Sequence, residues 1–271
     1  MRTNFILGAA LLASVVTTAQ AAPELVKNGG FERVVGGPGY SHEFGAGYKY
    51  GDTVVGWSSP ASTAFNVIFY PGQANGKGND HGNASTKYSP GNPGGQDGQY
   101  LWTSTPSPFG GKFVALDGDN RSAANPGGTL NPVVGEGNGP LQQTISRLRI
   151  GHTYTVSFDY AGAQYRDRTG ATTDELYTTF GGVQKSTGTF NNDSMGFTGW
   201  KTWSSSFTAT AKSQLLSFLS VGTPSGLPPV ILLDGVSVKD TSNIVVPEPA
   251  MLGVLGLGLA GLAGLARLRR R

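Results

Sequence analysis

Few side chains in this 271-residue sequence have the types and spacings that enzymes use for catalysis. The chain has no cysteine, which excludes a thiol nucleophile, and its three histidines (His42, His81 and His152) lack the H-E-x-x-H spacing of a zinc site. No G-x-S-x-G nucleophile motif occurs. A glycosidase needs two carboxylates facing each other across a sugar, and the sequence does not identify such a pair. The sequence therefore predicts a protein that is not an enzyme.

One carboxylate is notable because its neighbours along the chain are apolar. In a strictly alternating strand, Asp234 would share one face with Val230, Leu232, Val236 and Val238. An ionised carboxylate on an apolar face is costly unless it is paired or coordinated. Two explanations remain open: either Gly235 marks a β-bulge that turns the side chain outward, or the carboxylate binds a cation.

The elements that would position such residues are short strands. Forty-two glycines, together with many Asn, Ser and Thr residues, favour strands joined by tight turns and long loops. The clearest strand covers residues 153–160, where Tyr154, Val156, Phe158 and Tyr160 alternate with polar side chains. About nine or ten such strands predict one all-β domain, a jelly-roll β-sandwich with long Gly/Asn-rich loops. The other predicted strands start near residue 24 and cover 54–57, 64–70, 112–119, 141–148, 176–183, 200–208, 215–221 and 230–238, with loops at 71–99, 120–139 and 190–199.

The C-terminal end carries three features in order. The motif Val246-Pro247-Glu248-Pro249 is followed by an uncharged apolar stretch over residues 250–266 and a basic end over residues 267–271. A helix over the apolar stretch would be about 25 Å long, near the short limit for crossing a bilayer. The arginines would keep the end of that helix on the cytoplasmic side. A buried core helix is the alternative, but such a helix should have a polar face, which this stretch lacks.

This ending resembles the PEP-CTERM protein-sorting tail of Gram-negative bacteria. The resemblance implies that residues 242–271 form a sorting tail with the motif at Val246, Pro247, Glu248 and Pro249 and a transmembrane helix at 250–266. It also implies an exosortase partner, a membrane-embedded transpeptidase-like enzyme that cuts near the motif. The precursor would be held transiently in the inner membrane and then delivered to the cell surface or the extracellular matrix.

The N-terminal end is typical of an exported protein. Arg2 precedes an apolar stretch over residues 5–16, and Ala19-Gln20-Ala21 offers a small-x-small cleavage pattern. These features predict a signal peptide over residues 1–21, with an uncleaved membrane anchor as the alternative. Residues 22–241 then form the sandwich domain, which has no disulfide framework because the sequence has no cysteine.

The net charge of +3 does not indicate nucleic-acid binding. Five of the 20 basic residues lie in the two ends (Arg2 and the four tail arginines), so the sandwich domain is nearly neutral. A phosphate-binding surface would need clustered Lys and Arg side chains, which the domain lacks apart from two short pairs at 147/149 and 166/168.

Three blocks of the domain resemble galactose-binding-like jelly-roll domains, which include several carbohydrate-binding modules and the DUF642 cell-wall proteins. The blocks are LVKNGGFE at residues 25–32, LQQTI with GHTYTVSF at residues 141–145 and 151–158, and LLDGVSV at residues 232–238. In related sandwiches, an acidic residue of the opening motif and one near the last strand help to hold a structural calcium ion. The resemblance implies that Glu32 and Asp234 take these roles, with backbone carbonyls completing an oxygen shell. A hydrogen-bonded turn carboxylate is the alternative.

The same resemblance implies polysaccharide binding, in which aromatic rings stack on the apolar faces of sugars. The candidate platform residues are Tyr100, Trp102 and Trp57; the first two lie at the edge of a long loop. Trp200 and Trp203 are three apart and would point to opposite faces of a strand, so at least one belongs in the core. The predicted function is polysaccharide binding by a non-enzymatic protein of exopolysaccharide or biofilm. The alternatives are an adhesive or structural matrix protein that contacts other proteins, and a glycan-active hydrolase.

Overall fold

Antiparallel strands build the unit of the chain that the structure describes. The computed structural model describes residues 22–35, 43–44, 53–59, 66–71, 74, 101–119, 139–165, 169–224, 227 and 229–242. Residues 23–242 belong to this unit. The predicted signal peptide, the sorting motif and the apolar stretch lie outside the described residues. Within the described ranges, no helix is long and apolar enough to cross a bilayer.

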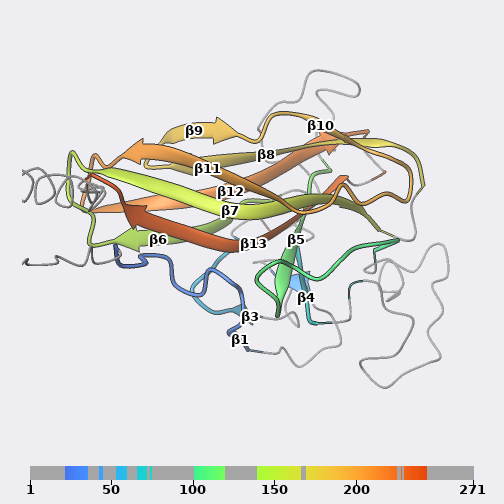
Figure 1. The fold of residues 1–271 in the computed structure, drawn as a ribbon, viewed down its shortest axis with the longest axis horizontal. Helices are drawn as coiled ribbons and strands as arrows, with labels where there is room; N and C mark the ends of the chain where they lie inside the picture. Colours follow the sequence, from blue (N-terminus) through green and yellow to red (C-terminus); the bar gives the residue numbers. More distant parts are fainter. Residues whose placement is uncertain are drawn as a thin grey trace, which may run out of the picture. The chain divides into compact units, whose positions relative to one another are not determined.

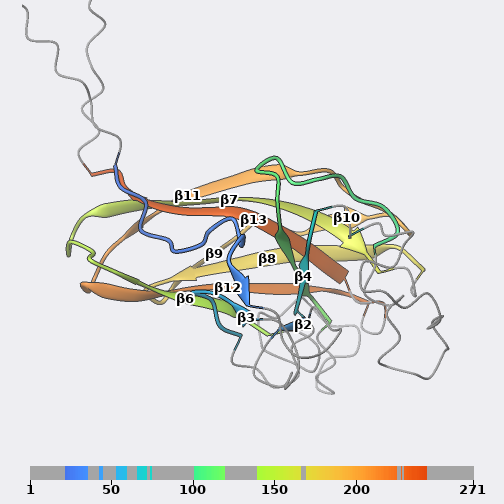
Figure 2. The ribbon, with the colours of Figure 1, turned by 90° about the horizontal axis from the view of Figure 1, so that it is seen from below.

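The strands form two larger antiparallel sheets (Figures 1 and 2). The first sheet has six strands in the order β11-β7-β13-β5-β4-β2, and the second has β10-β8-β12-β6 with β9 paired to β8. A short pair, β1 (Val34–Val35) with β3 (Thr53–Val54), stands apart from both. The six-stranded sheet consists of β2 (Glu43–Phe44), β4 (Asn66–Phe69), β5 (Phe113–Asp117), β7 (Thr153–Gln164), β11 (Lys201–Thr208) and β13 (Pro229–Asp240). The five-stranded sheet consists of β6 (Leu141–Ser146), β8 (Thr172–Phe180), β9 (Val183–Ser186), β10 (Phe190–Asn192) and β12 (Ser213–Thr223).

Successive strands cross between the sheets, which is the connectivity of a jelly roll. The chain passes from β6 in the five-stranded sheet to β7 in the six-stranded sheet and back to β8, and it repeats the exchange through β11, β12 and β13. Each exchange brings one apolar face of a new strand into the space between the sheets. The all-β sandwich predicted from the sequence is confirmed for the described residues.

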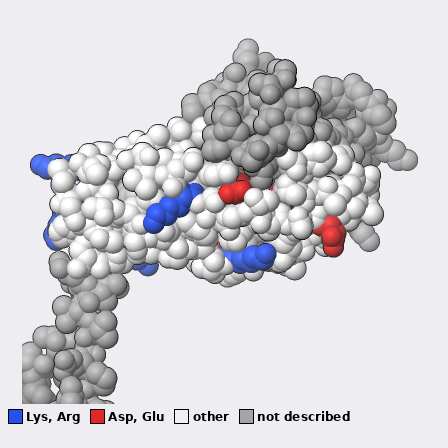
Figure 3. Space-filling view, turned by 90° about the horizontal axis from the view of Figure 1, so that it is seen from above, with Lys and Arg blue, Asp and Glu red and all other residues white. Residues whose placement is uncertain are grey.

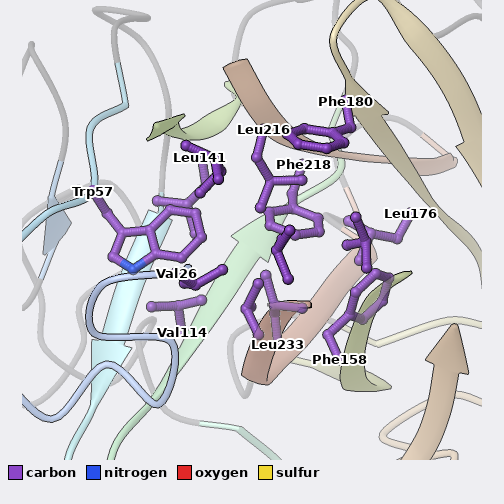
Figure 4. Packing of buried hydrophobic residues seen from close by; sticks show 14 of the residues in the cluster. Val26, Trp57, Val114, Leu141, Phe158, Leu176, Phe180, Leu216, Phe218 and Leu233 are labelled. Atoms are coloured by element: carbon purple, nitrogen blue, oxygen red, sulfur yellow. The ribbon is translucent and has the colours of Figure 1, made fainter. Parts of the chain in front are cut away.

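The main core lies between the two sheets (Figure 4). On β7 the residues predicted to share one face, Tyr154, Val156, Phe158 and Tyr160, all belong to this core. The core also takes alternate residues of the opposite sheet, including Leu176, Phe180, Leu216 and Phe218.

A second apolar cluster lies on the other face of the six-stranded sheet. It contains Val67 and Phe69 of β4, Phe113 and Ala115 of β5, and Ala161, Ala163, Val230 and Leu232 of the central strands. These residues alternate with those of the main core, so this sheet is buried on both faces. Leu101 and Ala74 cover the second cluster, with Phe197 and Trp200 packed against it.

Three predictions about the strands were wrong. Residues 24–27 do not form a strand, because the Glu24 carboxylate accepts the Leu25 and Val26 N–H groups, although the Leu25 N–H also donates to the Val238 carbonyl of β13 at 3.1 Å. The strand predicted over 176–183 starts earlier, at Thr172, and ends at Phe180, because Gly181-Gly182 form a two-residue turn with positive φ values of 58° and 85°. The predicted loop at 190–199 contains β10, which pairs with β8.

Candidate functional site

The layer over the second apolar cluster contains two of the tryptophans. Leu101 is fully buried, and its neighbour Trp102 is half-buried. The backbone N–H of Trp102 donates to the Gln164 carbonyl at 3.0 Å. Trp200 packs edge-on against Phe113 with ring centroids 5.4 Å apart, and its indole N–H donates to the Thr105 carbonyl at 3.1 Å. Trp102 and Trp200 are therefore both partly exposed, and the segment at residues 101–105 is joined to β7 through Trp102 and to the Trp200 indole through Thr105.

The other predicted aromatic positions have different places. Trp57 is only 7% exposed and packs between Phe31 and Phe218, with ring centroid distances of 5.4 and 6.0 Å. Its rings have no free face for a sugar, so Trp57 belongs to the core and not to a binding platform (Figure 4). Tyr100 lies outside the described residues.

Trp203 and Trp200 point to opposite faces of the six-stranded sheet, as their spacing predicts. Trp203 stacks on Phe158 of the main core at 4.8 Å, whereas Trp200 contacts the outer cluster.

A β-bulge occurs at Gly235, which is the first of the two explanations that the sequence offers for Asp234. The pairing of β13 with β7 shifts register between Asp234 and Ser237, and Gly235 has a φ of 60°. The shift sends Val236 and Val238 into the main core, so Asp234 no longer shares their face. Asp234 stays on the outer face with Leu232 but is fully buried there.

The cover over Asp234 is a loop that two carboxylates hold in place. Ser107 donates a hydrogen bond to Asp234 Oδ2, and the Gly235 N–H donates to Oδ1 at 2.7 Å. A few residues further along the loop, the Lys112 N–H donates to Glu32 Oε1 at 2.6 Å, and Lys112 Nζ lies 3.5 Å from Glu32 Oε2. The structure therefore brings the two predicted calcium ligands to the same loop, residues 107–112.

The electrostatics of this region would favour a bound cation. Burial raises the pKa of Asp234 to about 7, against the lowering effect of the hydrogen bonds from Ser107 and Gly235, and the charges of Glu32 and Asp159 raise it further. Asp159 is the cross-strand partner of Asp234, and like charges directly opposite each other destabilise a sheet.

Glu32, Asp234 and Ser107 supply carboxylate and hydroxyl oxygens, which are the donor type that calcium prefers. Among the described residues, no group of three or more His, Cys, Asp and Glu side chains is arranged to hold a metal ion. Any calcium here would therefore need the Ser107 hydroxyl, backbone carbonyls or water to complete its shell.

Sequence reasoning missed Ser107, Lys112 and Asp159. Ser107 and Asp234 are 127 positions apart, and Ser107 lies between two prolines in a segment without a strand pattern. Asp159 is one of the polar side chains that alternate with the apolar face of residues 153–160, yet it is only 7% exposed.

The exposed surface carries little charge on the side drawn in Figure 3. Its Lys and Arg side chains are spread out and are not gathered into one patch. A surface of this kind does not match the clustered positive charge that a nucleic acid needs.

No protein-family model matches this sequence, and no curated protein matches it. Among solved structures, it is similar to the carbohydrate-binding module TmCBM61 in complex with β-1,4-galactotriose (15% identity, covering 81% of this chain and 99% of that chain, TM-score 0.37). It is also similar to a CBM4 module (15% identity, 80% and 99% coverage, TM-score 0.32). A third is the CBM22-1 xylan-binding domain from Paenibacillus barcinonensis Xyn10C (10% identity, 83% and 99% coverage, TM-score 0.35). Scores this low establish neither a family nor a function for this chain.

Proposed function

We propose that this protein is an exported, non-enzymatic protein that binds polysaccharide through the aromatic layer over its six-stranded sheet. The observation that carries this proposal is the pair Trp102 and Trp200, which are half-buried in a layer fixed by main-chain hydrogen bonds. The Trp200 indole, held by its hydrogen bond to the Thr105 carbonyl, loses little side-chain freedom when a ligand stacks on it. Exposed Thr103 and Thr105 offer hydroxyls beside the rings, and Tyr100 is adjacent in the chain.

The ends of the chain give the proposal its cellular setting. We propose that a signal peptide over residues 1–21 exports the chain and that the motif Val246-Pro247-Glu248-Pro249 is processed by an exosortase-type enzyme. Transient anchoring in the inner membrane through residues 250–266 would precede delivery to the cell surface or the matrix. Replacement of Pro247 and Pro249 by alanine should leave the full-length precursor in the membrane fraction, which immunoblotting of cell fractions would detect.

Replacing Trp102 by alanine should weaken binding to polysaccharide. The full-length chain in mild detergent is sedimented with insoluble xylan, β-1,4-galactan, cellulose and calcium alginate. Loss of one anchoring aromatic ring weakens the binding free energy by about 2 kcal/mol, so the affinity of Trp102→Ala for the polysaccharide should fall about 30-fold. Ile150→Ala is the matched control, because it removes an exposed apolar side chain (61% exposed) from a distant turn.

Three results would contradict parts of this proposal. If Trp102→Ala binds the glycans as well as the wild-type chain does, Trp102 is not part of a binding platform. If the wild-type chain binds none of the four glycans, an adhesive role toward proteins is favoured. Release of reducing sugar during the incubation would indicate a hydrolase instead.

We propose further that Glu32 and Asp234 bind a structural calcium ion. Calcium at 100 times its dissociation constant would stabilise the folded chain by about 2.7 kcal/mol, which corresponds to a rise in Tm of roughly 5–10 °C for a domain of this size. Burial raises the pKa of Asp234 to about 7, and calcium must displace that proton, so the rise in Tm should grow from pH 6 to pH 8.

Melting curves in calcium and in EDTA test this site. Asp234→Asn should lose the calcium-dependent rise in Tm, whereas Asp193→Asn, which removes an exposed carboxylate, should keep it. Equal melting temperatures of the wild-type chain in calcium and in EDTA would rule the calcium site out.

A further inference from the structure

The outer face of the five-stranded sheet is lined by polar side chains. On β6, β8 and β12, residues such as Leu141, Leu176 and Phe218 point into the main core. The residues between them point the other way; most are polar and half-buried or exposed, whereas Glu175, Leu219 and Val221 are buried. This outer face, called here the Tyr177 face, consists of Gln142, Thr144, Thr173, Glu175, Tyr177, Thr179, Leu215, Ser217, Leu219, Val221 and Thr223.

Tyr177 lies on the middle strand of this face and is held by its neighbours. It pairs across the sheet with Leu219 on one side and Ser186 on the other. Burial raises the pKa of Tyr177, and the nearby charge of Glu175 raises it further. Glu175 in turn accepts a hydrogen bond from Thr189 Oγ1 at 2.6 Å. Tyr177 itself is half-buried, so part of this residue stays exposed on the face.

The groups on the Tyr177 face suit a neutral, hydroxyl-rich ligand. Hydroxyl and amide groups from Gln142, Thr144 and Ser217 can both donate and accept hydrogen bonds. Among the described strand residues of this face, Glu175 is the single carboxylate, and there is no Lys or Arg. Lys185 of the neighbouring β9 turns away, donating to the Ser206 carbonyl of β11 at 2.8 Å. Glu175 is only 7% exposed and already accepts from Thr189, so the exposed part of this face is uncharged. An acidic glycan would find no compensating cation there, whereas a neutral glycan needs none.

The Tyr177 face and the Trp102 layer lie on opposite sides of the molecule. Both sheets contribute one face to the main core, so their remaining faces point away from each other. Trp200 contacts the cluster on the outer face of the six-stranded sheet, and Trp102 follows Leu101 of that cluster. Figures 1 and 2 show the two sheets as separate layers.

From this placement we propose that the chain has a second glycan-binding surface, centred on Tyr177, and that one molecule joins two neutral polysaccharide chains. The proposal rests on the proposed function at the Trp102 layer and extends it, because a protein with one binding surface coats a polysaccharide whereas one with two opposed surfaces cross-links it. The expected partner of the Tyr177 face is an uncharged glycan chain.

Bead aggregation measures this cross-linking. Beads are coated with whichever of xylan, β-1,4-galactan or cellulose retains the wild-type chain, and full-length protein in mild detergent is added at limiting concentration. The wild-type chain should aggregate the beads. Tyr177→Ala and Trp102→Ala should each still bind to beads, with lower capacity, but should no longer aggregate them, and the double variant should do neither.

Further variants separate a binding role from a structural one. Tyr177→Phe keeps the ring and should keep the aggregation. Ser217→Arg places a long side chain across the same face and should abolish aggregation, which serves as the test if Tyr177→Ala does not fold by its melting curve. Beads coated with alginate should not be aggregated.

The outcomes distinguish this inference from the function on which it rests. Aggregation by Tyr177→Ala at the wild-type level, or binding by the wild-type chain without aggregation, would overturn the second surface and leave the Trp102 platform intact. No binding by the wild-type chain to any of the beads would overturn both.

Discussion

Replacement of Trp57 by alanine should destabilise the domain strongly without directly removing a binding surface. The indole is 7% exposed, packs between Phe31 and Phe218, and donates its N–H to the Asn28 carbonyl at 2.9 Å. Truncation of a buried tryptophan to alanine lowers the free energy of unfolding by about 3–5 kcal/mol, because the transfer free energy of the ring is lost and a cavity remains. The midpoint of chemical denaturation should fall accordingly, and the Tm should drop by roughly 10 °C.

Two comparisons make the Trp57 result specific. Trp57→Phe keeps most of the packing and should lose less stability than the alanine variant, while Ile150→Ala should melt like the wild-type chain. A Trp57→Ala chain that melts at the wild-type temperature yet no longer binds polysaccharide would instead return Trp57 to the binding platform.

Replacement of Asp174 by asparagine should remove a large part of the pH dependence of stability. Asp174 points into the space between the sheets, is fully buried, and has no hydrogen-bond partner for Oδ1. Burial raises its pKa to about 8, against the lowering effect of the Thr172 hydroxyl, from 3.8 in the absence of burial. Its neighbours are Gly162 of β7, Phe190 of β10 and Gly222 of β12, and none of these side chains can titrate.

The sign of the effect follows from the two pKa values. Between about pH 4 and pH 8 the unfolded chain releases the proton of this carboxyl while the folded chain keeps it, so the free energy of unfolding falls as the pH rises. At about 1.4 kcal/mol per pH unit, the upper bound of the loss is on the order of 5 kcal/mol. Asp174→Asn has no proton to release and should be the more stable chain at pH 8.

Denaturation curves of both chains at pH 4, 6 and 8 check this prediction. The pKa of Asp234 is raised to about 7, which gives a slope of the same sign, so Asp174→Asn is compared with the double variant Asp174→Asn/Asp234→Asn. Asp193→Asn is the matched exposed control. Parallel pH profiles for the wild-type chain and Asp174→Asn would mean that Asp174 is solvated or paired in the folded state.

Local pattern predicted the strands well where one face of the strand is apolar. The alternation over residues 153–160 identified β7, since that strand places every second side chain in the main core. The Gly181-Gly182 turn had a clear signal in the sequence, but its two glycines were included in a strand. The segment at residues 24–27 is apolar enough for a strand, yet the carboxylate of Glu24 competes for its N–H groups.

The candidate sites show a different limit of sequence reasoning. The bulge at Asp234 could be predicted, because an acid on an apolar face next to a glycine has few solutions. The loop that covers Asp234 could not, since Ser107 and Lys112 have no local pattern and reach their partners across 127 and 80 positions. Burial of Trp57 could not be predicted either, because an isolated tryptophan near a turn is compatible with both core and surface.

The position of β13 determines how a mechanical load would pass through the domain. This last strand lies between β7 and β5, pairing with β7 over most of its length and with β5 near its start. A pull applied at residue 242 therefore runs along β13 and shears its hydrogen bonds together, instead of opening them one at a time. Leu25 donates to the Val238 carbonyl at 3.1 Å, and the Glu24 carboxylate accepts from Ser237 and Val238, which fastens the opening segment beside the same strand. A domain held at its C-terminal end while its faces hold other molecules would thus carry tension through its most heavily paired strand.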